Sequence, residues 1–178
     1  MSKRNQLVMF AAAFLSLSAM GSFAEPPSML AQKMMGDDPG GDTRTPLPLT
    51  APMANHQKQM MRGHLEAVQA IIAGLAADNM PAIVRAADSM GYTTMVANMC
   101  RHLGAAAPDD DFVNRALAFH KSAGAIADAA RKGDRLGVLG ALNHTMGSCV
   151  ACHATYRQQV VDTDTFKRLT EARQSPLH

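Results

Sequence analysis

The stretch SCVACHATYR, residues 148–157, lies near the C-terminal end of the chain and governs how the rest of the sequence is interpreted. Cys149 and Cys152 are three positions apart, and His153 follows at once. On a helix, residues three or four positions apart share one face, so the two thiols and the imidazole are expected to project together. Paired thiols beside an imidazole indicate a zinc site, a thiol redox pair or a covalently attached haem.

Covalent haem suits this spacing best. Cys-x-x-Cys-His is the attachment signature of c-type haem, in which two thiols bond to the porphyrin and the histidine binds the iron. A structural zinc site usually draws four ligands from two clusters, and the sequence has no second cluster. A thioredoxin-type pair lies at a helix start that follows a strand, whereas this pair lies late in a helical pattern. We therefore expect one haem c on Cys149 and Cys152, with His153 on the iron.

The N-terminal residues 1–24 have the pattern of a cleavable secretory signal. A short basic region precedes an apolar run at 7–17, and small residues precede the expected cleavage between Ala24 and Glu25. The alternative is a membrane anchor, but this run is short for the ~30 Å of hydrocarbon in a bilayer. We expect an exported, periplasmic protein with no membrane span in its mature form.

Charge and composition narrow the class of protein further. Cleavage would remove two basic residues and no acidic one, which leaves 15 Lys and Arg against 15 Asp and Glu. A chain with this balance has no basic field for nucleic acid. Aromatic residues are scarce, tryptophan is absent and there are 14 methionines, which favours helices over sheets.

The exported part divides into three regions. Residues 25–50 carry several prolines and a glycine-rich patch, so we expect a flexible or extended leader. Residues 51–161 contain the helical patterns and are expected to form one domain. Residues 162–178 are polar and are expected to fray.

Within that domain, apolar side chains recur at steps of three and four in four segments, which are about 50–79, 81–103, 112–132 and 134–160. The second segment contains Gly91, a candidate break. The expected inward residues of the first segment are Met61, Leu65, Val68, Ile72 and Leu75; those of the fourth are Leu139, Leu142, Met146, Cys149, His153, Tyr156 and Val160. With short connections, these segments predict an all-α fold, an antiparallel up-down-up-down four-helix bundle with the haem bound covalently on the last helix.

A bundle with this motif on its last helix resembles the class II c-type cytochromes, the cytochrome c prime family. The resemblance covers roughly residues 52–160 and depends on CVACHATYR, residues 149–157. It implies that the two cysteines are thioether positions, that His153 is the proximal iron ligand and that Arg157 lies near the proximal face of the haem. Dimers formed through the first two helices are common in the family, so a homodimer is expected.

Arg157 also has an interpretation that does not depend on the family. Tyr156 and Arg157 follow His153 by three and four positions, which places them beside it on a continuous helix. The guanidinium can then bind a haem propionate through a charge-assisted hydrogen bond. The alternative is an ordinary surface arginine after a core tyrosine.

The second axial position of the iron separates the candidate functions. In the family, the distal residue comes from the first helix and is a methionine in some members and aliphatic in others. Met61 leads the apolar face of that helix and matches this position, whereas Met60 is rotated ~100° away. His64 would instead give a bis-histidine iron. We therefore expect Met61 as the second iron ligand. Because methionine is often only a core residue, His64, Met60 and the absence of a protein ligand stay open.

Three functions follow from these alternatives. The first is a low-spin, six-coordinate cytochrome that exchanges one electron with redox partner proteins and is not an enzyme. The second is a five-coordinate haem protein that binds nitric oxide or carbon monoxide. The third is a periplasmic copper-handling protein that uses methionine and histidine side chains.

Cys100 is not explained by the haem motif. It is interpreted as a small buried hydrophobe, with a disulfide between two subunits as the main alternative. A copper site at Met99, Cys100 and His102 is the third interpretation, because a thioether, a thiol and an imidazole stand close together in sequence.

Overall fold

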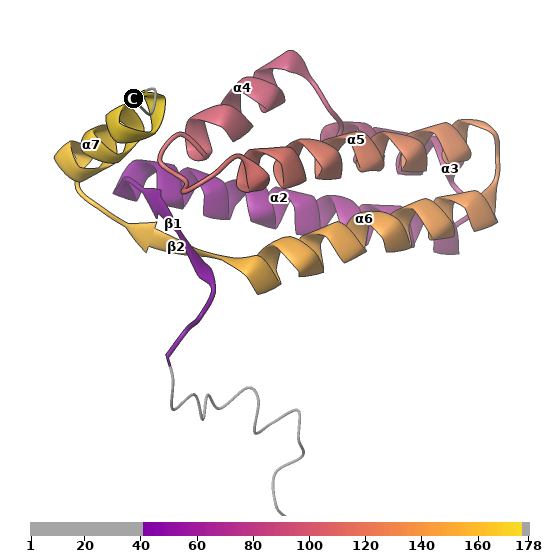
Figure 1. The fold of residues 1–178 in the computed structure, drawn as a ribbon. Helices are drawn as coiled ribbons and strands as arrows, with labels where there is room; N and C mark the ends of the chain where they lie inside the picture. The colour runs from indigo at the N-terminus through magenta and orange to yellow at the C-terminus, as the bar shows by residue number, and fades with distance from the viewer. Residues whose placement is uncertain (1–40, 176–178) are drawn as a thin grey trace, which may run out of the picture. The chain divides into compact units, whose positions relative to one another are not determined.

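The computed structural model describes residues 41–175, so the expected signal at 1–24 and the first part of the leader lie outside the described residues. The described chain is mostly helical, as predicted (Figure 1). Its elements are β1 (Thr45–Leu49), α2 (Ala51–Ala76), α3 (Met80–Ser89), α4 (Thr94–Leu103), α5 (Asp111–Arg131), α6 (Arg135–Thr155), β2 (Tyr156–Val160) and α7 (Thr163–Gln174). Over this range, none of the helices is both long enough and apolar enough to cross a membrane.

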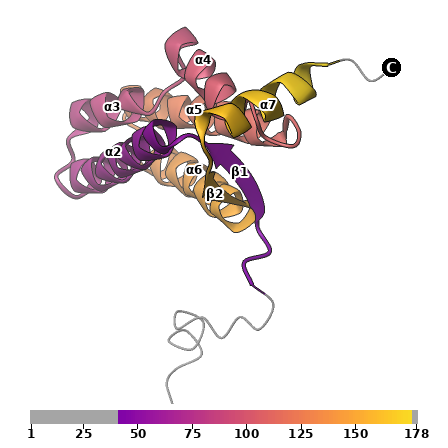
Figure 2. The same cartoon turned by 90° about the vertical axis from the view of Figure 1, so that its left-hand side faces the viewer.

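Four helices enclose the main core. Helix α2 packs against α3, α3 against α5, and α5 against α6, and these helices lie alongside one another in both views (Figures 1 and 2). Alanine-rich faces let the helices approach closely: a Cβ added at Gly74 of α2 would lie 2.6 Å from Ile83 Cγ1 of α3. Ile71, Ile83 and Ile126 are fully buried in this core.

The helix boundaries follow local capping signals. The expected break at Gly91 is confirmed, since α3 ends at Ser89 and α4 begins at Thr94. Thr93 caps α4 by accepting a hydrogen bond from the Val96 amide, 3.1 Å away. Between α5 and α6, Gly133 adopts a φ of +70°, which is costly for a residue with a Cβ.

The buried side of α2 differs from the predicted one. Met61, Leu65 and Ile72 were expected to face inward but are 37%, 70% and 52% exposed. Leu75 is buried as expected. The buried residues of α2 are Ala54, Gln57, Ala67, Ile71, Gly74 and Leu75. The pattern selected one apolar side of the helix, whereas the neighbouring helices pack against another, which combines Ile71 and Leu75 with small residues.

The fourth predicted helix is both rotated and shorter. Leu139 and Met146 are exposed, and the buried residues of α6 are Val138, Leu142 and Thr145. The helix was expected to continue to about residue 160 but ends at Thr155, because Tyr156 adopts extended backbone with φ −117° and ψ 147°.

Two short strands form a sheet that the sequence did not predict. β1 pairs in parallel with β2, with Thr45 opposite Tyr156 and Leu49 opposite Val160. Leu47 and Leu49 of β1 are buried. The last ten residues of the expected flexible leader therefore include an ordered strand.

Residues 163–174, expected to fray, form helix α7. Asp162 caps this helix by accepting a hydrogen bond from the Thr165 amide. Arg173 donates to the carbonyl oxygen of Gly104 at 2.6 Å and also binds Asp110. These contacts attach the polar helix to the connection between α4 and α5, although no residue of α7 itself is buried.

Candidate functional site

A cavity of about 840 Å³ lies at the end of the helices where the two strands pair. Its volume is within the ~300–1,000 Å³ range of small-molecule and cofactor sites. Side chains from α2, α4, α5, α6 and β2 line it, together with Asp42 and Arg44 from the segment before β1. Residues that are far apart in sequence therefore meet at one space.

The last turns of α6 supply one wall of this cavity. Cys149, Cys152 and His153 all line it, so the three residues singled out in the sequence are brought together at one cavity. Cys152 is half-buried and also packs against a cluster that includes Tyr156, while His153 is exposed. The two thiols are free, as is that of Cys100.

The environment of the two thiols disfavours a thiol redox pair. Burial raises the pKa of both the Cys149 and the Cys152 thiol above the usual range. The Cys149 thiol donates to the Thr145 carbonyl oxygen at 3.5 Å. Reactive redox cysteines need a lowered pKa, because the thiolate is the nucleophile.

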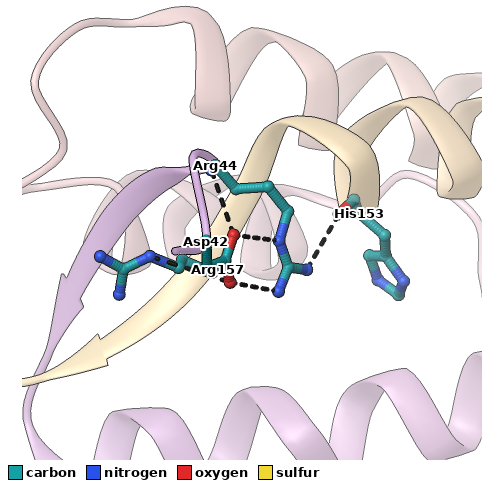
Figure 3. Close-up of polar contacts among 4 residues, drawn as sticks. All are labelled: Asp42, Arg44, His153 and Arg157. Carbon is teal, nitrogen blue, oxygen red and sulfur yellow. Dashed lines mark hydrogen bonds and ion pairs between the residues drawn. The ribbon is translucent and has the colours of Figure 1, made fainter. Parts of the chain in front are cut away.

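Asp42 and Arg44 hold the end of α6 (Figure 3). Arg44 binds Asp42 through two hydrogen bonds, Nε to Oδ1 at 2.9 Å and Nη2 to Oδ2 at 2.6 Å. Its Nη1 donates to the carbonyl oxygen of His153 at 3.1 Å, which satisfies one of the carbonyls left without a partner at a helix end. The Arg44 hydrogen bond is the main cause that lowers the pKa of Asp42 to about 2.

Arg157 also lies near Asp42, but on a strand rather than on the expected helix. It was predicted one helical turn beyond His153, but it lies on β2, where side chains alternate between two faces. Its Nε is 3.9 Å from Asp42 Oδ2, which is close enough for an ion pair but too far for a hydrogen bond. Among residues 41–175, this buried Nε has no hydrogen-bond partner. Both Arg157 and His153 line the cavity.

Helix α2 supplies candidate residues on another wall. Met60, Met61, His64 and Leu65 all line the cavity. Met61 and Leu65 are the exposed apolar residues that the periodicity predicted to be buried. Their exposure therefore has a local explanation: they face this cavity rather than the helical core.

His64 is held by rings from α5. Its ring centroid is 4.8 Å from that of Phe119 and 5.4 Å from that of His120. Burial, and to a smaller extent the neighbouring His120, lower the pKa of His64 to about 4. At neutral pH the ring is uncharged, so one nitrogen has a lone pair.

His120 is a buried, hydrogen-bonded histidine of α5. Its Nδ1 lies 2.7 Å from the Met90 carbonyl oxygen. Because a carbonyl oxygen only accepts, Nδ1 carries the proton and Nε2 is left as an acceptor. His120 also lines the cavity.

Tyr156 connects β2 to the start of α5. Its hydroxyl donates to Asp111 Oδ2 at 2.8 Å, and its ring lies edge-on to Phe112. Burial and the Asp111 hydrogen bond raise the pKa of Tyr156 to about 12. Gln158 binds α2 in a similar way, through Nε2 to Gln57 Oε1 at 2.6 Å.

Cys100 lies apart from its sequence neighbours. It is 2% exposed and lines the large cavity, as expected of a small buried hydrophobe. A thiol buried to this extent favours that interpretation over a disulfide with another subunit. Met99 and His102 instead line a second cavity, so the predicted trio at Met99, Cys100 and His102 does not assemble.

Sequence reasoning missed Asp42, Arg44 and Gln57 as cavity residues. Asp42 and Arg44 stand in a segment whose prolines and glycines indicated a flexible leader. Their role is revealed only by the hydrogen bond from Arg44 to the His153 carbonyl, 109 positions away, and by the pairing of Asp42 with Arg44. Gln57 lies four positions before Met61, on the same side of the helix, but its amide side chain gave no reason to expect it in a cavity. The opposite charges of Asp42 and Arg44, two positions apart, were the one sequence feature that could have indicated an ordered ion pair here.

Comparisons of this chain with protein-family models, with curated proteins and with solved structures find no match. The chemical interpretation of the cavity therefore depends on its residues and their geometry.

Proposed function

We propose that this protein is an exported, periplasmic c-type cytochrome that carries one haem c and transfers single electrons between partner proteins. The observation that carries the proposal is the meeting of Cys149, Cys152 and His153 at one large cavity. In this proposal the two thiols form the thioether bonds and the His153 imidazole binds the iron. When bound, the haem supplies a one-electron redox couple, so no bond-making step is assigned to the protein.

The cavity residues fit such a group in polarity. The apolar side chains of Met61 and Leu65 face the cavity and are otherwise exposed. Within the described part of the chain, Arg44, Arg62, Arg115 and Arg157 line it, with Asp42 as the one carboxylate. The partnerless Nε of Arg157 suits a carboxylate such as a haem propionate.

The proposal extends to the fold and to the assembly. α2, the α3–α4 pair, α5 and α6 correspond to the four arms of an antiparallel up-down-up-down bundle. Membership in the cytochrome c prime family and a homodimer remain part of the same proposal. The strand pair β1–β2, with Asp42, Arg44 and the first residues of β2 in the cavity wall, is a feature of this chain on which the resemblance made no prediction.

Met61 is our proposed second iron ligand. It lines the cavity and retains enough exposure to move toward a bound group. His64 is more buried, but its ring is tilted against Phe119 and edge-on to His120, so coordination would require it to leave both rings. That restraint on His64 also favours the second candidate, a five-coordinate haem that binds nitric oxide or carbon monoxide, if Met61 does not coordinate.

A mass and a spectrum test the proposal. Protein matured in cells that attach c-type haem should gain the mass of one haem, and Cys149→Ser with Cys152→Ser should lose it. Cys100→Ser is the matched control and should retain the haem. A polypeptide of unmodified mass from such cells would refute the function.

Carbon monoxide distinguishes the two haem functions. An electron carrier with Met61 bound should be low-spin when reduced and unchanged by the gas. Met61→Leu should make it high-spin and responsive, whereas Met60→Leu should not. A wild-type spectrum that the gas shifts at once would support the gas-binding candidate, and a low-spin Met61→Leu protein would assign His64.

A further inference from the structure

A second cavity, of about 490 Å³, lies between the first turns of α2 and the last turns of α4. Its lining includes two thioethers and two imidazoles, which are Met53 and His56 from α2 and Met99 and His102 from α4. His56 and His102 are exposed and the two methionines are half-buried, so solvent ions can reach all four side chains.

The side chains of His56 and Met99 are already in contact. His56 Nε2 lies 2.8 Å from Met99 Sδ, although the two residues are 43 positions apart in sequence. A thioether is a weak hydrogen-bond acceptor, so hydrogen bonding gives little reason for this pairing. Both atoms are, however, good ligands for a soft metal ion.

The geometry needs only a small change to admit an ion. With bonds of about 2.0 Å to nitrogen and 2.3 Å to sulfur, tetrahedral ligands lie about 3.5 Å apart. The two atoms must therefore separate by less than about 1 Å. Met99 has several rotatable bonds and can make this adjustment without moving the backbone.

The chemistry of the donors selects the ion. Among the described residues, no carboxylate and no thiol lines this cavity, which disfavours magnesium, calcium and structural zinc. Thioethers prefer Cu(I), and imidazole also binds copper. Four neutral ligands suit a monovalent cation, because no negative charge is needed for compensation.

We propose that His56 and Met99 bind one cuprous ion, with Met53 and His102 completing the ligand set. This site replaces the trio predicted from sequence: His56 takes the place of Cys100, which faces the large cavity. The site does not depend on haem, because its four residues line a separate cavity and the proposed haem ligands Cys149, Cys152 and His153 are absent from it.

Methionine methyl spectra test this site within the intact protein. The full chain, labelled with 13C at the methionine methyl groups, is titrated with Cu(I) under nitrogen and separately with Ag(I), which has the same charge and does not undergo redox cycling. The Met99 methyl signal, assigned from its loss in Met99→Leu, should shift until one equivalent is bound. The signal of Met95, which is exposed on the same helix, should not shift.

Competition with a coloured Cu(I) chelator gives the affinity. Met99→Leu and His56→Gln should each weaken binding at this site at least tenfold, whereas Met95→Leu and His144→Gln should leave it unchanged. Leucine conserves the volume of methionine, and His56 is exposed, so both variants are expected to fold. A Met99 signal that does not shift, or equal affinities for all four variants, would overturn the proposal. Cu(I) bound by the distant thiols of Cys149 and Cys152 would not move the Met99 signal, and repeating the titration with Cys100→Ser excludes the neighbouring thiol.

Discussion

Replacing Ile71 by alanine tests which face of α2 is buried. Ile71 is 0% exposed and lies in the main core beneath α3. Removing a fully buried isoleucine side chain typically costs about 2–5 kcal/mol, which combines lost burial with the cavity left behind. We expect the upper half of that range, because rigid helices on either side limit collapse around the site. Urea unfolding followed by circular dichroism at 222 nm measures this loss of the free energy of unfolding.

The adjacent residue is the matched control. Ile72 is 52% exposed, so Ile72→Ala should lower the free energy of unfolding by less than about 1 kcal/mol, because alanine also favours the helix. A larger loss for Ile72 than for Ile71 would contradict the structure and restore the face predicted from sequence. Repeating both measurements at two protein concentrations separates this outcome from burial of Ile72 between subunits.

Two further predictions concern helix packing and the cavity. Gly74→Ala would place a Cβ 2.6 Å from a side chain of α3. Overpacking costs about 1–3 kcal/mol and the better helix propensity of alanine returns about 1 kcal/mol, so the free energy of unfolding should fall by up to about 2 kcal/mol. Gly63→Ala, which meets nothing within 4 Å, should raise the free energy of unfolding by about 1 kcal/mol in the same urea assay. In Tyr92→Phe protein, absorbance at 295 nm should show Tyr156 ionising at about 12, since burial and the hydrogen bond to Asp111 raise its pKa. The unfolded tyrosine ionises near pH 10, so this contribution to stability is complete below pH 10 and declines toward pH 12; a midpoint near 10 in the folded protein would contradict the hydrogen bond.

Local signals predicted where most of the core helices begin and break, although they missed α7 and the early end of α6. Gly91 lies in the four residues between the end of α3 and the start of α4. Gly133 is followed directly by Asp134, the cap of α6. Asp134 accepts a hydrogen bond from the Gly137 amide at 2.8 Å, as expected of a cap. Such signals act over a few residues, so they can be read from the sequence.

The orientation of α2 could not be predicted in this way. The helix has two apolar sides, one facing the core through Ile71 and one facing the cavity through Met61 and Leu65. Periodicity identifies both sides as apolar and cannot distinguish burial by protein from contact with a cavity. The large side chains therefore drew the prediction to the cavity side.

The strand pair also lay beyond sequence reasoning. Pro46 and Pro48 remove backbone donors from β1, which argues against a strand in most settings. They are tolerated because each strand of a two-stranded sheet has an unpaired edge. The pairing of Thr45 with Tyr156 joins segments more than a hundred residues apart, and no local pattern reports such a contact.

The pairing of β1 with β2 has a consequence for the order in which the cavity closes. Because β1 precedes all the described helices and β2 follows α6, synthesis completes the second strand only after most of the chain exists. Until these residues are made, Arg44 has no His153 carbonyl to bind, and this wall of the cavity is incomplete. If the proposed haem is attached to Cys149 and Cys152, it would enter the cavity more easily before Arg44 binds the His153 carbonyl than afterwards.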